Sequence, residues 1–281
     1  VGQVFHWLGK QYVHEKQEHV IQIQTRAWNS LFPTLVAIFL GFLLGLVLYY
    51  FKIRLLDSEY TRTLVTQLRS SNNIGVIISL TMLAMLSWWC GLGFPLQTLT
   101  HTNNTGAAIV NLNYALTHGN SADVPYKYLG SSLVQGYGLM GNAVIFLSLV
   151  VVLLLYTNDK QIEAISKVNL LPTAFGAKNG LAVGIPMILN PLYLLPILII
   201  PAINELIAAG AISTQLIRPC VYPVLDGTPG ILIPFFGTNG SWISFIFTIL
   251  LFILDILILI PFIKIGQRIN KELKEYDEAK V

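Results

Sequence analysis

The chain has 281 residues, of which 54% are hydrophobic and only 11% are charged. Soluble domains carry ~25% charged residues, so this chain has too little charge to cover a globule that faces water. The composition excludes a disordered chain, a collagen, a coiled coil and a nucleic-acid-binding surface, and the net charge of +3 comes from basic residues at the edges of apolar runs. These runs predict an all-α polytopic membrane protein that crosses the lipid bilayer several times.

The first part of the chain is more polar than the apolar runs after it. Residues 1–30 form a polar, amphipathic segment that starts at Val1 without a signal-peptide pattern, which predicts a fragment or a trimmed product. A transmembrane domain is expected over 31–268, and a charged tail, expected to be a short helix, over 269–281.

Five stretches are apolar enough to cross a ~30 Å hydrocarbon core as helices. They are 31–51, 74–96, 144–156 with its Gly-rich approach, 192–212 and 243–263. Pro196 and Pro201 interrupt the fourth stretch, which predicts a kinked helix whose freed carbonyls are satisfied by neighbouring helices.

The basic residues predict the orientation, because positively charged loops stay on the cytoplasmic side. They follow the first span, the third span and the last span: Lys52, Arg54, Arg62 and Arg69, then Lys160 and Lys167, then Lys264, Arg268, Lys271 and Lys274. Only Lys127 lies within 101–135. We therefore expect a multi-pass cell-membrane protein with a cytoplasmic C-terminus and an external 101–135 stretch.

Two apolar segments, 170–190 and 218–240, are broken by Gly, Pro, Asn and one or two charges. Irregular backbone survives at membrane depth only where protein or a water-filled cavity faces it, and paired broken segments often mark a transporter's binding site. We expect two re-entrant hairpins, over about 172–190 and 219–240, whose tips meet near the midplane. Surface loops are the alternative.

The sequence contains no Walker A, GxGxxG, HExxH or GxSxG motif, and its five histidines all lie in polar stretches. No catalytic residue, metal site or cofactor is therefore predicted. Asp255 lies inside a predicted span, where a carboxylate is either functional or a hydrogen-bonded packing residue. Trp88 and Trp89 are typical of an aromatic belt at a membrane interface.

The strongest local pattern is AFGAKNGLAVGIPMILNPLYLLPILIIPAINELIAAGAI over 174–212. It resembles the permease component, enzyme IIC, of the bacterial phosphoenolpyruvate:sugar phosphotransferase system, in its lactose/cellobiose/diacetylchitobiose family. The matching features, in chain order, are Ser30-Leu31-Phe32-Pro33, the LLLYTNDKQ run before the pattern, Gly184-Ile185-Pro186, Asn190-Pro191, Pro196, Pro201, Asn204, Thr228-Pro229 and Gly240-Ser241-Trp242. The family has further spans before the first of these features, which predicts a truncated chain or a shortened relative.

The sequence departs from the family where the family contacts sugar. At the family's Asn-Glu-Pro this chain has Lys178-Asn179-Gly180, with Asn179 at the position of the Glu that hydrogen-bonds the sugar hydroxyl. Gly93 replaces a family His, and Asp226 replaces a Trp. An Asn cannot act as a general base, and losing a Trp removes a stacking face. Lys178, Asn179 and Asp226 instead predict a polar cavity shared with Asn190, suited to another polyol or an anionic sugar.

The resemblance implies a sugar transporter that takes up a β-linked disaccharide of the cellobiose, chitobiose or lactose type. Its partners would be cytoplasmic IIB and IIA proteins, with a phospho-cysteine IIB phosphorylating the sugar, and it would form a homodimer. The enzyme role stays open because the family's Glu and His are absent. The alternative is a non-transporting membrane receptor or regulator, or a permease for another polar solute. Asp226 or Glu205 is the expected counter-ion of Lys178.

Overall fold

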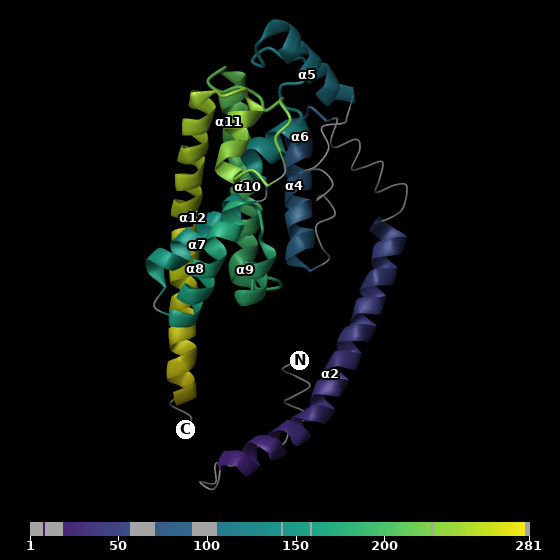
Figure 1. The fold of residues 1–281 in the computed structure, drawn as a ribbon, viewed down its shortest axis with the longest axis vertical. Helices are drawn as coiled ribbons and strands as arrows, with labels where there is room; N and C mark the ends of the chain where they lie inside the picture. The colour runs from purple at the N-terminus through teal and green to yellow at the C-terminus, as the bar shows by residue number, and fades with distance from the viewer. Residues whose placement is uncertain are drawn as a thin grey trace. The chain divides into compact units, whose positions relative to one another are not determined.

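A computed structural model describes residues 8, 19–56, 71–91, 106–141, 143–157, 159–225 and 227–278 of the chain. The ordered elements within these residues are all helical. The chain divides into two compact units, Val1–Thr61 and Arg62–Val281, which are described separately (Figure 1).

The first unit contains one long helix, α2 (His19–Leu56), of 38 residues. It covers the predicted span at 31–51. Its large apolar side chains between Leu31 and Val47 are exposed, with Ile38 and Leu44 each 62% exposed. Such a surface is unfavourable in water and suits a lipid or protein environment.

The second unit is a packed group of helices and short helical turns. They are α4 (Ile74–Trp89), α5 (Gly106–His118), α6 (Gly130–Ser132), the π-helix η2 (Leu133–Gly138), α7 (Val144–Tyr156), α8 (Lys160–Ala174), α9 (Asn179–Gly184), α10 (Pro191–Ser213), the 3-10 turn η3 (Gly230–Leu232), α11 (Ile233–Gly237) and α12 (Trp242–Glu278). In Figure 1, α12 runs beside α11 at one end and beside α7 further along. The central helix α10 packs on α4, η2 and α12, and α7 packs on α8 and α12.

Two described helical stretches are long and apolar enough to cross a membrane, Pro191–Ser213 and Trp242–Ile269. Three shorter apolar helices accompany them: Leu31–Val47, Ile74–Trp89 and Val144–Tyr156. The five predicted spans therefore all fold as helices. The difference is at the second one, which ends at Trp89 instead of continuing to 96, because Gly91 has φ +76° and its N–H bonds back to Trp88 O at 2.9 Å.

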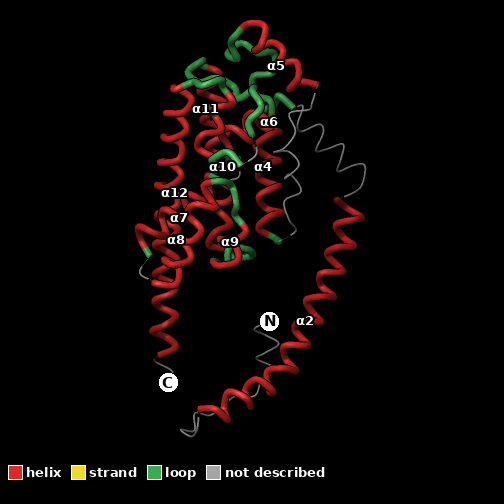
Figure 2. The backbone as a smooth tube through the Cα atoms, in the orientation of Figure 1, coloured by secondary structure: helices red, strands yellow, loops and turns green. Residues whose placement is uncertain are grey.

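The two broken segments both double back on themselves (Figure 2). In the first, α9 returns along α8: a Cβ on Gly180 would meet Asn169, and one on Gly184 would lie 2.6 Å from Ile165 Cγ2. In the second, the N–H groups of Val221 and Tyr222 both donate to Gly237 O, at 2.8 and 3.0 Å.

Both broken segments also pack on the same turn, residues 140–141 and 143, which precedes α7. A Cβ on Gly176 would lie 3.0 Å from Gly141 O, and one on Gly230 would contact Met140 O and lie 2.5 Å from Ala143 Cβ. The turn before α7 therefore contacts the first broken segment near Gly176 and the second at Gly230, in η3.

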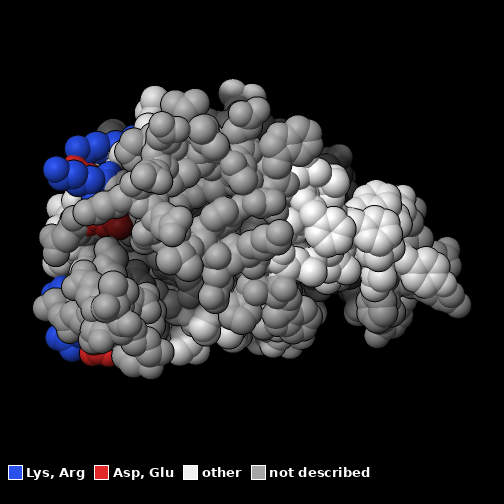
Figure 3. Space-filling model, turned by 90° about the horizontal axis from the view of Figure 1, so that it is seen from below, with Lys and Arg blue, Asp and Glu red and all other residues white. Residues whose placement is uncertain are grey.

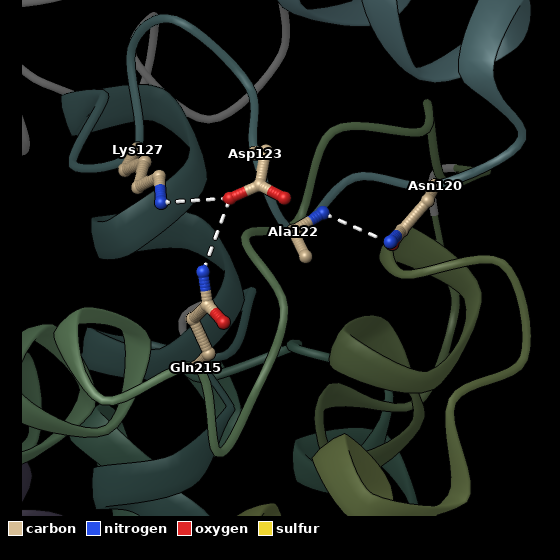
Figure 4. Close-up of polar contacts among 5 residues, drawn as sticks. All are labelled: Asn120, Ala122, Asp123, Lys127 and Gln215. Carbon is tan, nitrogen blue, oxygen red and sulfur yellow. Dashed lines mark hydrogen bonds and ion pairs between the residues drawn. The ribbon is translucent and has the colours of Figure 1, made fainter.

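Charged side chains lie at both ends of the second unit. At one end, Gln267 of α12 donates to Tyr156 O at 2.6 Å, and Lys264 Nζ lies 5.0 Å from the Tyr156 ring centroid. Lys and Arg side chains gather at one edge of the face seen in Figure 3. At the other end, Asp123 accepts from Lys127 Nζ at 3.2 Å and from Gln215 Nε2 at 3.1 Å (Figure 4).

Candidate functional site

The break between α9 and α10 is held by the last turn of α4. The Leu189 N–H donates to Trp89 O at 3.0 Å, and the Trp89 indole N–H donates to Asn190 O at 2.9 Å. Leu189 has φ +58°, a left-handed conformation that a leucine rarely adopts. These two long-range hydrogen bonds fix the backbone at the point where the first broken segment turns into α10.

Both the oxygen and the nitrogen of the Asn190 side-chain amide form hydrogen bonds at this break. Its Oδ1 accepts from Leu192 N at 3.1 Å, and its Nδ2 donates to Pro186 O at 2.9 Å. It is the N-cap of α10, and Pro191 follows at the first helical position. Of the predicted site residues, Asn190 thus has a clear positioning role in the structure.

Lys178 lies in the turn between α8 and α9 and is only 9% exposed. Its Nζ lies 5.7 Å from the ring centroid of Trp88 in α4 and 5.6 Å from that of Phe146 in α7. The two rings meet edge to face with centroids 5.0 Å apart. Aromatic faces attract a cation, so the two rings stabilise the buried ammonium group.

Asn179 is the first residue of α9 and is exposed, unlike the lysine before it. The structure thus directs Lys178 towards the packed interior and leaves the neighbouring amide accessible. Lys178 and Asn190 both contact the last turn of α4, through Trp88 and Trp89 respectively. The other two predicted site residues, Gly93 and Asp226, lie outside the described residues.

The sequence predicts an aromatic belt at Trp88 and Trp89, whereas the structure gives each of them contacts inside the unit. Trp88 is 7% exposed and belongs to the core, so it is a packing partner of Lys178, and Trp89 anchors the α10 cap. Phe146 carried no sequence signal beyond its place in an apolar run. The adjacent Trp88-Trp89 pair at the end of a span is equally typical of a belt, so the pattern alone could not distinguish the two roles.

Two buried acidic residues lie elsewhere in the same unit. Glu205 of α10 is 0% exposed and faces η2, because a Cβ on Gly138 would lie 2.6 Å from its Oε1. It is close to the Thr81 hydroxyl, which already donates to Ile77 O at 3.1 Å. Asp255 of α12 is also 0% exposed and accepts from Asn204 Nδ2 at 3.1 Å. Within the described residues, no cluster of three or more His, Cys, Asp or Glu side chains could hold a metal ion.

Comparison with known proteins gives this arrangement a context. No protein-family model matches the chain. The cellobiose-specific EIIC component of the phosphotransferase system (PTS) from Lactococcus lactis subsp. lactis (strain IL1403) is 22% identical over 281 residues, covering 90% of this chain and 56% of that protein. The lactose-specific EIICB component of Streptococcus mutans serotype c (strain ATCC 700610 / UA159) is 27% identical over 187 residues, covering 64% of this chain and 31% of that protein.

The fold has a counterpart among solved structures. It matches the crystal structure of the transporter ChbC, the IIC component from the N,N'-diacetylchitobiose-specific phosphotransferase system, with a TM-score of 0.61 and 22% identity over 96% of this chain and 63% of that chain. The chain is a distant homologue of PTS IIC components of the lactose/cellobiose/chitobiose family over most of its length. The resemblance found from the motifs is thereby confirmed. The chain spans about half the length of its cellobiose-specific relative and a smaller share of the lactose-specific one.

Proposed function

We propose that the chain is part of a membrane IIC permease that takes up a β-linked disaccharide of the cellobiose, chitobiose or lactose type, coupled to its phosphorylation by a IIB partner. The observation that carries the proposal is the distant homology to cellobiose- and lactose-specific PTS components together with the ChbC-like fold. Partnership with IIA and IIB and assembly as a homodimer are part of the same proposal.

The geometry supports a sugar site at the first broken segment. Asn179 supplies an accessible amide that can both donate to and accept from hydroxyl groups. Lys178 supplies a cation that the rings of Trp88 and Phe146 hold beside it. In the proposal these two residues and Asp226 bind the solute, Gly93 leaves room for it, and Asn190 fixes the shape of the segment.

The topology in the proposal rests on the doubled-back segments. Segments 172–190 and 219–240 are re-entrant hairpins that approach each other around the turn before α7, which both contact. The start of α8 and the extension of α12 are cytoplasmic. Support comes from their exposed basic residues, Lys160, Lys167, Lys264 and Arg268, and from the Gln267–Tyr156 bond that places both at one end of the unit.

The uptake test uses cells that lack their own permeases for these sugars but contain IIA and IIB. Expression of the chain should produce intracellular sugar phosphate from at least one of cellobiose, chitobiose and lactose. A binding screen of purified protein against these sugars and ascorbate accompanies it. Failure to bind or phosphorylate any of them contradicts the proposal.

A second candidate function rests on one observation, the amide of Asn179 where the family carries a Glu. Without a carboxylate at this position, the chain would bind a solute without passing it on, as a membrane receptor or regulator. Sugar binding in the screen with no sugar phosphate formed in the cells would favour this candidate.

Orientation is tested separately with a membrane-impermeant thiol reagent. A cysteine introduced by Arg268→Cys should be labelled only after the cells are opened. Labelling in intact cells would place the end of α12 outside and contradict the proposed topology.

A further inference from the structure

Helices α10 and α12 are joined by a polar contact in the interior of the unit. Asn204 of α10 and Asp255 of α12 are both 0% exposed. The Asn204 Nδ2 group donates to Asp255 Oδ2 at 3.1 Å, which connects residues 51 positions apart in the sequence. One side of this contact is thus an ordinary amide-to-carboxyl hydrogen bond.

The other oxygen of each side chain has no hydrogen-bond donor within the part of the chain that the structure describes. Asn204 Oδ1 and Asp255 Oδ1 are each buried and have no hydrogen-bond partner among the described residues. An amide oxygen only accepts, and so does each oxygen of an ionised carboxylate. The pair therefore presents two further acceptor oxygens. The second N–H of Asn204 Nδ2 satisfies neither of them, because both oxygens are without a hydrogen-bond partner among the described residues. Leaving buried acceptors without donors is strongly unfavourable.

A compensating cation is not found around Asp255 in the described part of the chain. The ion pairs described there join Lys127 to Asp123 and Lys167 to Glu163, both away from this contact. The titratable residues on the elements packed against α12 are Tyr193 and Glu205 on α10 and Tyr156 at the end of α7, while η3 and α11 contain none. On α12 itself, Lys264 is exposed and lies over the Tyr156 ring.

We propose that Asp255 is a proton-binding site, and that the protonated Asp255 and Asn204 form a closed acid–amide pair. Asn204 Nδ2–H donates to Asp255 Oδ2, and Asp255 Oδ1–H donates to Asn204 Oδ1. One proton, taken from solvent, satisfies both orphaned oxygens and leaves no charge in the interior. The pair connects α10, three residues after Pro201, to the long apolar helix α12.

The pair makes a specific demand on substitutions. Asp255→Asn replaces the acid by an amide that can also donate and accept once on each side, so the two-bond pair is retained. Asp255→Leu and Asn204→Leu each leave one polar partner buried without the other. The double variant Asn204→Leu/Asp255→Leu removes both polar groups, so its loss should be smaller than the sum of the single losses.

The first experiment measures the melting temperature of these variants in detergent. Asp255→Asn should melt within about 3 °C of the parent, while each single Leu variant should melt roughly 3 to 10 °C lower. Glu163→Gln, which removes an exposed carboxylate, is the control. An Asp255→Asn variant that is as unstable as Asp255→Leu would show that the ionised carboxylate is needed, and would overturn the proposal.

The second experiment observes the proton directly in the parent protein. Infrared spectra at neutral pH should contain the C=O stretch of a protonated carboxylic acid that is lost in Asp255→Asn, shifted in Asn204→Leu and unchanged in Glu163→Gln. Because Glu205 is another buried acid, Glu205→Gln identifies its own contribution to that region. If the parent protein shows no band of a protonated carboxylic acid beyond the one assigned to Glu205, the proposal is overturned, whether or not the other variants fold.

Discussion

The second unit buries charged residue types in two different ways. Lys178 lies in a turn, with its ammonium beside two aromatic rings. Glu205 lies inside α10, against Gly138 and near Thr81, and neither of its oxygens has a hydrogen-bond partner among the described residues. Both contact the same buried face of α4, through Trp88 and Thr81, which are about two helical turns or ~10 Å apart.

The two regions also differ in how accessible they are. The lysine stands beside the exposed Asn179, in a segment whose helix is only six residues long. The acid is enclosed by α4, η2 and α10, which are among the most extensively packed elements of the unit. The first region therefore has the accessible polar side chain that the proposed binding site requires, whereas the second holds helices together.

The largest expected effect comes from removing the aromatic face over Lys178. Trp88→Ala deletes a core side chain that is 7% exposed and should lower the free energy of unfolding by ~3–5 kcal/mol. Chemical denaturation in detergent measures it. The control is Trp242→Ala, because Trp242 is 67% exposed, and its loss should be ~1 kcal/mol or less. Equal losses for the two tryptophans would remove the distinction between the core ring and a peripheral one.

A smaller effect tests the enclosure of Glu205. Gly138→Ala adds a Cβ that would lie 2.6 Å from Glu205 Cγ and Oε1, and should cost ~1–3 kcal/mol of stability. Gly210→Ala makes the same change in α10 where nothing lies within 4 Å, and should be neutral or stabilising by ~0.5–1 kcal/mol. Adding Glu205→Ala to Gly138→Ala should recover part of the loss. If both glycine variants are equally stable, the space beside Glu205 is larger than the structure shows.

Much of the fold could be predicted from local sequence. The apolar run at 144–156 coincides with α7, and the predicted 192–212 helix differs from α10 by one residue at each end. Asn190 followed by Pro191 is a helix-start signal, so its capping role was also readable. The family resemblance instead assigns Asn190 to the polar cavity.

The polar interior could not be predicted in the same way. Asn204 meets Asp255 from 51 residues away, and Glu205 meets Gly138 across two elements. Each depends on how α10 packs, and no local spacing encodes that. The Gly, Pro and Asn residues locate the broken segment at 170–190, but the direction of Lys178 depends on the rings of Trp88 and Phe146, which come from two other helices.

The smallest predicted effect separates the two asparagines of the proposed site. Asn190→Ala removes the cap of α10 and the bond to Pro186 O, so stability should fall by ~1 kcal/mol. Asn179→Ala changes an exposed side chain and should alter stability by less than ~0.5 kcal/mol. If Asn179 contacts the solute, its variant should instead weaken binding of the sugar identified in the screen. The opposite result would be an unstable Asn179→Ala and an Asn190→Ala that affects only sugar binding. It would mean that Asn190 contacts the ligand and that Asn179 is structural.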